Sequence, residues 1–187
     1  SKAKLDTVKD LAPTLDLSPN TDHYMADLQA RTELLANTFG KQAAAAKRLR
    51  TIQTKQAKLK AQTQGKTALM LFTNKGNFMP HAAGERFGFV YDFAGFKSVL
   101  PVVPPKDENA PAQPRPEAGS LAAEAAKVKA AERLQAAVNQ QPDYLIVLDR
   151  GAVNTNEYTA AAEMQKNAIL QQTKGKVIMV DANAWYL

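Results

Sequence analysis

The sequence predicts an α/β fold whose sheet is mostly parallel and Rossmann-like. Three short apolar runs, at residues 67–73, 144–149 and 177–181, are continuous rather than alternating, which is typical of strands buried on both faces. Helical patterns lie between these runs, at residues 85–94, 120–140 and 157–171. This alternation favours parallel strands joined by right-handed crossovers, with helices on both faces of the sheet.

The composition agrees with a folded domain and excludes several kinds of site. The chain has 187 residues, of which 45% are apolar and 22% charged, so a sizeable core is expected. It has no cysteine, which excludes disulfides, thiolate nucleophiles and cysteine-bound zinc. No apolar run is long enough to cross a membrane, and we expect no signal peptide in the chain.

Three helices are predicted before the first strand. Residues 2–11 form a short helix, and residues 13–17 are extended because Pro13 holds the chain outside a helix. A second helix is capped by Thr21 or Asp22 and stopped by Gly40. The third helix, residues 41–66, follows at once and ends around Gly65.

The third helix carries the basic charge of the protein. Residues 41–66 contain eight lysines and arginines and no acid, while the whole chain has a net charge of +6. The apolar stripe of this helix is narrow, which favours a strut with most of its circumference in water. Nucleic-acid binding stays an alternative, although the segment has no aromatic residues for stacking on bases.

The segment between the first two apolar runs is rich in proline. Residues 98–103 predict a weak fourth strand, interrupted by Pro101. Residues 101–119 then form an extended surface loop, which is either an insertion or, as an alternative, a peptide ligand for another domain.

Polar and aromatic residues follow the predicted strands at the edge where ligands bind in open parallel sheets. Asn74 follows the first run, Arg150 the second, and Trp185 and Tyr186 the third. Arg86 is expected at the start of the short helix after the first run. Guanidinium groups pair with oxyanions and stack on aromatic rings, so this set favours a planar, anionic, oxygen-rich ligand. In a plainer alternative, the arginines form structural ion pairs and the aromatic residues cap the core.

Few residues could carry catalysis. The sequence has no nucleophile elbow, phosphate-binding loop, dinucleotide-binding glycine motif or His-Glu-x-x-His zinc motif. His81 lies in a predicted loop near the crevice and could act as a general base or a metal ligand. An enzyme with His81 or Asp149 as its base therefore remains an alternative.

Five short segments carry a family resemblance through their order and spacing. They are Leu71-Phe72-Thr73-Asn74, Gly84-Glu85-Arg86-Phe87-Gly88, Pro142-Asp143-Tyr144-Leu145, Asp149-Arg150-Gly151 and Trp185-Tyr186-Leu187. They resemble the ferric-siderophore-binding proteins of bacterial ABC importers, and in particular the branch that carries catecholate-type siderophores. The resemblance covers most of the chain.

The resemblance implies two α/β lobes joined by one long helix, with the ligand in the cleft between them. Residues 1–40 then correspond to a remnant of the N-terminal lobe, residues 41–65 to the connecting helix and residues 66–187 to the C-terminal α/β lobe. We expect a truncated chain, because the family usually continues into a final helix. The lobe remnant would expose apolar side chains and favour self-association; these are Leu5, Val8, Leu11, Leu15 and Leu17.

The resemblance also implies a binding protein rather than an enzyme. Arg86 and Arg150 match arginines that contact catecholate oxygens, and Tyr186 matches a tyrosine that coordinates the iron in some members. Those members also supply a histidine, but this chain has none after His81. No intrinsic cofactor is expected, since the ferric siderophore is the ligand. The implied partner is an ABC permease of the inner membrane, although Gln135 replaces a glutamate often found at a docking position. The implied location is periplasmic, or lipid-anchored outside the cell.

Overall fold

The computed structural model confirms a mixed α/β fold built on a mostly parallel sheet. It describes residues 14–15, 17, 23–104, 116–117, 119–153 and 155–185. Within these residues the sheet contains β1 (Thr67–Asn74), β2 (Asn77–His81), β3 (Lys97–Ser98), β4 (Tyr144–Asp149) and β5 (Lys176–Met179). The strand order is β2-β1-β4-β5, and β3 also pairs with β1. All pairings are parallel except that of β1 with β2.

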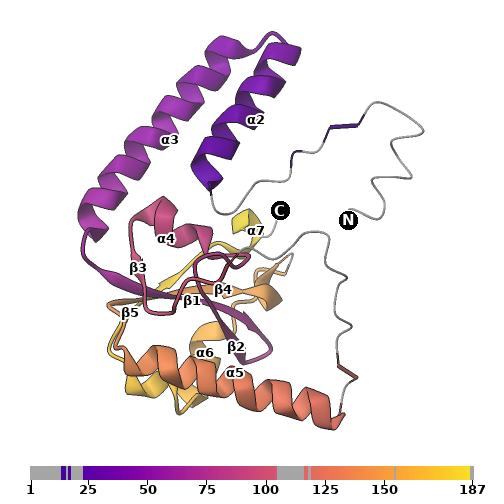
Figure 1. The fold of residues 1–187 in the computed structure, drawn as a ribbon, viewed down its shortest axis with the longest axis vertical. Coiled ribbons are helices and arrows are strands. Elements are labelled where there is room, and N and C mark those ends of the chain that lie inside the picture. Colours follow the sequence, from indigo (N-terminus) through magenta and orange to yellow (C-terminus); the bar gives the residue numbers. More distant parts are fainter. Residues whose placement is uncertain are drawn as a thin grey trace.

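Helices cover both faces of this sheet (Figure 1). One face is covered by α5 (Leu121–Asn139) and α6 (Ala160–Lys166), and the other by α4 (Phe89–Ala94) and α7 (Ala182–Trp185). Alternate side chains of β1 belong to different cores, Leu69 and Leu71 to the α5 side and Met70 to the α4 side. Burial on both faces explains why β1 and β4 have continuous apolar sequences, as predicted.

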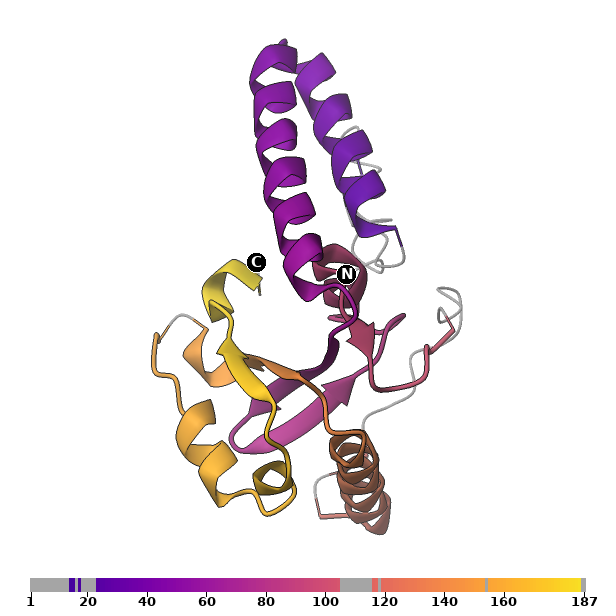
Figure 2. The same ribbon diagram turned by 90° about the vertical axis from the view of Figure 1, so that its left-hand side faces the viewer.

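Two antiparallel helices project from the α4 side of the sheet, as Figures 1 and 2 show. They are α2 (Tyr24–Thr38) and α3 (Gln42–Thr63). The base of α3 contacts α4, where Gln56 Nε2 donates to the Phe93 carbonyl at 3.1 Å and Lys60 Nζ lies 3.3 Å from Asp92 Oδ1. Most other side chains of α3 are exposed, which agrees with the predicted solvated strut. Among the described helices, none is long and apolar enough to span a membrane.

Strand β2 is a correction to the sequence prediction, which placed these residues in a loop. Lys75 and Gly76 form a two-residue turn with φ values of 51° and 77°, and this backbone matches the right-handed twist of a β-hairpin. Thr73 therefore pairs with Phe78, and Met70 with His81. His81 is the last residue of an edge strand rather than a loop residue.

Strand β5 is a second correction, because the sequence predicted a strand buried on both faces. Its apolar side chains Val177, Ile178 and Met179 are 47%, 40% and 36% exposed. Within the described residues β5 pairs with β4 alone, so it forms an edge of the sheet with one side unpaired.

Two other predicted elements are shorter than expected. The helix predicted for residues 157–171 divides into α6 and a 3-10 turn, η2 (Leu170–Gln172), because the Asn167 side chain accepts the backbone N–H groups of Ile169 and Leu170. The weak strand predicted for residues 98–103 is reduced to β3. The first predicted helix, the caps at Thr21 and Asp22, and most of the proline-rich loop lie outside the described residues.

Candidate functional site

Arg150 lies directly after β4, at the carboxyl edge of the parallel strands. It begins a 3-10 turn, η1 (Arg150–Ala152), which contacts β1 and α7. The preceding carboxylate, Asp149, is 1% exposed and accepts the backbone N–H groups of Gly151, Thr159 and Ala160 at 2.9, 2.8 and 2.9 Å. Asp149 therefore orders the loop that carries Arg150, which gives it a structural role in place of the general base weighed above.

Arg86 lies in the turns between β2 and α4, and not at the start of the helix as predicted. Its side chain is exposed, with the guanidinium carbon 5.0 Å from the centre of the Phe87 ring. Phe87 in turn stacks on Phe72 of β1, with ring centres 5.4 Å apart and planes inclined by 11°. Phe72 is the register partner of Leu148, two residues before Arg150. Arg86 is thus connected through Phe87 to the carboxyl-terminal half of β1, and Arg150 directly follows the neighbouring strand β4.

His81 lies against the same aromatic pair. Its ring makes edge contacts with Phe72 and Phe87, with centres 6.2 and 5.3 Å apart. Burial lowers the pKa of His81; the Glu85 carboxylate opposes this shift, and the charges of Arg133 and Arg86 add to it. The imidazole is therefore neutral at pH 7. Its buried Nδ1 has no hydrogen-bond partner among the residues that the structure describes.

The described residues contain no group of three or more His, Asp or Glu side chains that could hold a metal ion. His81 accordingly has no set of fellow ligands around it in this part of the chain. The prediction that iron is coordinated by Tyr186 falls on a residue outside the described ones.

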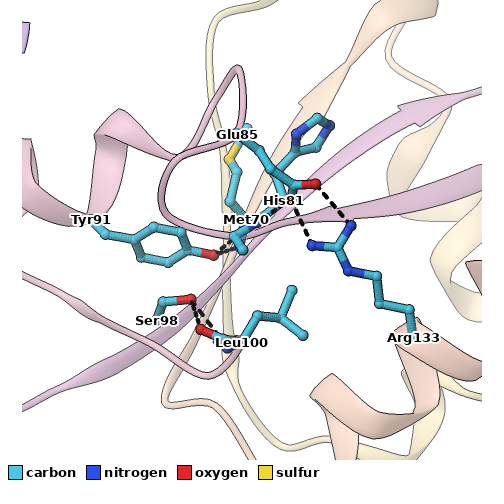
Figure 3. Close-up of polar contacts among 8 residues, drawn as sticks. Met70, His81, Glu85, Tyr91, Ser98, Leu100 and Arg133 are labelled. Atoms are coloured by element: carbon cyan, nitrogen blue, oxygen red, sulfur yellow. Dashed lines mark hydrogen bonds and ion pairs between the residues drawn. The ribbon is translucent and has the colours of Figure 1, made fainter. Parts of the chain in front are cut away.

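The segment from His81 to Tyr91 is held by a polar network that sequence reasoning missed (Figure 3). Arg133 of α5 donates to both carboxylate oxygens of Glu85, at 3.0 and 2.6 Å, and the Ala82 N–H donates to Glu85 Oε2 at 2.6 Å. The Tyr91 hydroxyl accepts the Met70 N–H at 2.9 Å and donates to the His81 carbonyl at 2.7 Å. Glu85 and Arg133 are 48 residues apart, so no local spacing could have signalled their pairing.

Trp185, at the end of α7, belongs to the α4 side of the molecule. Its indole lies 5.4 Å from the Phe89 ring, and Phe89 stacks on Tyr24 of α2 at 4.4 Å. These three rings connect α7, α4 and α2. The half-buried indole thus packs against the α4-side core, and α7 contacts η1, which begins at Arg150.

Asn74 lies close to the start of η1, because the residue before it, Thr73, is the register partner of Asp149. It ends β1 and lines an open groove of about 350 Å³ between the hairpin and α5. Phe78 and Leu134, which also line this groove, belong to the core on the α5 side of the sheet. The structure thus places His81, Trp185 and the Phe87 ring beside Arg86 on the α4 side of the sheet, whereas Asn74, at the end of β1, lines a groove against α5.

The sequence is similar to those of proteins that bind iron-siderophores, although no family model matches the chain. It is 30% identical over 188 residues to the ferric-anguibactin-binding protein FatB of Vibrio anguillarum, covering 95% of this chain and 52% of FatB. It is 25% identical over 183 residues to the petrobactin-binding protein YclQ of Bacillus subtilis, covering 95% of this chain and 51% of YclQ. The chain spans about half the length of these relatives.

The fold is shared with the periplasmic catecholate-siderophore binding protein VctP of Vibrio cholerae. The crystal structure of VctP aligns with a TM-score of 0.75 at 20% identity, covering 100% of this chain and 62% of VctP. The resemblance predicted from the five sequence segments is therefore confirmed, since the sequence relatives bind ferric anguibactin and petrobactin and the fold is shared with VctP.

Proposed function

We propose that this chain is part of the substrate-binding component of a bacterial ABC importer and binds a ferric siderophore of the catecholate type. The proposal is supported by Arg150, which directly follows β4, and by Arg86, whose neighbour Phe87 stacks on Phe72 near the end of β1, in a chain similar to a ferric-siderophore-binding protein. Such a component holds its ligand and delivers it to a permease, without chemistry of its own.

The chemistry of the arginines suits a ferric catecholate. The complex is anionic and presents pairs of oxygens, and guanidinium groups bind such pairs through two parallel hydrogen bonds. Arg86 lies over the Phe87 ring, which limits the directions its exposed guanidinium can take. In this proposal Trp185 and neutral His81 supply flat and weakly polar contacts beside the arginines, and Tyr186 is the residue that would reach the iron.

Two arginines cannot supply the whole affinity. Charge-assisted hydrogen bonds contribute about 1.5–3 kcal/mol each, whereas nanomolar binding needs about 12 kcal/mol. The remaining contacts fit a second lobe facing the first. We therefore assign residues 1–40 to a remnant of an N-terminal lobe, residues 41–65 to a connecting helix and residues 66–187 to the C-terminal lobe, with the ligand between the lobes.

The proposed partner is the ABC permease of the inner membrane, and the proposed location is the periplasm or, with a lipid anchor, the outer surface of a cell with one membrane. The structural neighbour VctP is a periplasmic protein, which supports the proposed location. The enzymatic alternative has little support, because the carboxylate of Asp149 is engaged by three backbone N–H groups.

The proposal is tested by titrating the full-length protein with an iron(III) tris-catecholate and following the quenching of tryptophan fluorescence. We expect Arg86→Ala and Arg150→Ala each to weaken binding at least tenfold, because each removes a charge-assisted contact. Arg50→Ala, an exposed arginine of α3, is the matched control and should bind like the wild type. Unchanged affinity in both site variants would show that the ligand binds at another site. Tighter binding of a ferric hydroxamate than of the ferric catecholate would contradict the proposed ligand class.

A further inference from the structure

We propose that Glu85 and Arg133 are positioning residues, which hold Arg86 in place for the ligand by tying the loop of residues 82–88 to helix α5. The inference rests on the proposed function for its ligand, but the ordering of the loop is a property of the protein alone. Neither residue needs to touch the ligand in this scheme.

The geometry of the pair is that of a strong ionic contact. Arg133 Nη1 and Nη2 lie 3.0 and 2.6 Å from Glu85 Oε1 and Oε2, which is the two-pronged arrangement that fixes both side chains in one orientation. The side chains are 36% and 20% exposed, so water competes weakly for the contact. Glu85 also accepts a hydrogen bond from the Ala82 N–H, so its carboxylate is bound to the backbone at the start of the same loop.

The charge of Glu85 is maintained by these contacts. Burial raises the pKa of Glu85, but the hydrogen bonds from Arg133 and the Ala82 N–H, together with the charge of Arg133, bring it below its ordinary value. The carboxylate is therefore ionised at neutral pH, and the loss of Arg133 would leave a partly buried charge without its partner.

The loop needs such an anchor because the sheet stops supporting it at His81. The Tyr91 hydroxyl occupies the Met70 N–H and the His81 carbonyl, so β2 ends there. Beyond it the chain turns sharply. Gly84 has a φ of 84°, and a Cβ at Gly84 or Gly88 would overlap the backbone carbonyl oxygen of Val103 or Ala82.

The anchor comes from the opposite layer of the molecule. Helix α5 covers the α5-side core and contacts β2, the strand at the sheet edge, whereas Phe87 and α4 belong to the other core. Figure 3 shows Arg133 reaching from α5 to Glu85 next to His81. The pair thus joins the two layers at the residue that directly precedes Arg86.

The first test needs no ligand. Amide hydrogen exchange of the full-length protein should be at least fivefold faster across residues 82–88 in Glu85→Gln and in Arg133→Gln than in the wild type, with β4 unchanged. Arg133→Lys keeps the charge but loses the second of the two hydrogen bonds to Glu85. Its exchange rate across residues 82–88 should therefore lie between those of Arg133→Gln and the wild type. The matched control is Glu132→Gln, an exposed glutamate beside Arg133, which should exchange like the wild type.

The second test is a double-mutant cycle with an iron(III) tris-catecholate. Glu85→Gln should weaken binding about three- to tenfold in the wild-type background and have no further effect when Arg86→Ala is present, because it acts through Arg86. An equal loss in both backgrounds would overturn the positioning role, since a direct or general structural effect would be additive.

The two tests separate this inference from the proposed function. If the wild type binds no ferric catecholate while exchange in the loop rises as expected, the function fails and the anchoring of the loop stands. If the wild type binds through Arg86 but Glu85→Gln matches it in exchange and affinity, the inference fails and the function stands.

Discussion

His81 shows how one residue responds to the packing around it. The imidazole lies against the stacked rings of Phe72 and Phe87, and burial lowers its pKa, with Glu85 opposing this shift and Arg133 and Arg86 assisting it. The unfolded chain therefore binds a proton at this position more readily than the folded protein does. By linkage, the contribution of His81 to stability is present above the ordinary histidine pKa and is lost as the pH falls through the lowered one.

We accordingly expect the free energy of unfolding to fall less between pH 7 and pH 5 in His81→Gln than in the wild type. Urea unfolding at the two pH values measures this difference. The matched control is His23→Gln, which replaces the other histidine, an exposed one. If the free energy of unfolding of His81→Gln falls as much as that of the wild type between pH 7 and pH 5, His81 is not a buried imidazole with a lowered pKa.

At the scale of elements, Tyr91 links α4 to the β1–β2 hairpin. Its hydroxyl bridges the Met70 N–H and the His81 carbonyl, two backbone groups of register partners that would otherwise face each other. Tyr91→Phe leaves both groups without a partner in a buried place, and we expect a loss of about 1–3 kcal/mol in the free energy of unfolding.

Chemical denaturation measures this loss, and Tyr158→Phe is the matched control. The Tyr158 hydroxyl accepts the Ala182 N–H at 3.1 Å, but Tyr158 is 44% exposed, so water can replace it and the effect should be smaller. Equal losses of unfolding free energy in the two variants would contradict the prediction, because they would show that the burial of the Tyr91 hydroxyl makes no difference to its contribution.

At the scale of the whole molecule, β5 forms an exposed edge of the sheet. Val177, Ile178 and Met179 are exposed on a strand whose outer hydrogen-bonding groups pair with no strand in the described part of the chain. Leu15 and Leu17, predicted to promote self-association, are also exposed at 53% and 39%, whereas Leu5, Val8 and Leu11 lie outside the described residues. Exposed edge strands with apolar side chains favour pairing between chains.

We therefore expect the 187-residue chain to self-associate with rising concentration, and Ile178→Lys to reduce the association because a charge on an edge strand opposes pairing. Sedimentation velocity over a range of concentrations measures both. Lys176→Ala removes a charge from the same strand and should not weaken association. A wild type that sediments as a monomer throughout would contradict this prediction.

Local sequence patterns predicted much of the α/β core. The runs that became β1 and β4 are continuously apolar from Ala68 to Phe72 and from Tyr144 to Leu148 because both of their faces are covered, and Ser120 caps α5 by accepting the Ala123 N–H. The basic helix ends near Gly65, whose φ of 78° suits a residue without a side chain. The Lys75-Gly76 dipeptide is also a local signal for a hairpin, because glycine readily adopts the positive φ that such a turn requires.

By itself the sequence determined the α/β class, the order of the main elements and the segments that carry Arg86 and Arg150, because these follow from periodicity and from residues close together in the chain. Only the tertiary structure decided that β5 lies exposed at an edge, that Asn74 lines a groove against α5, and that Glu85 pairs with Arg133. Burial and pairing of this kind depend on which distant segments come to lie against a residue, and that is set by the packing of the whole sheet and its helices.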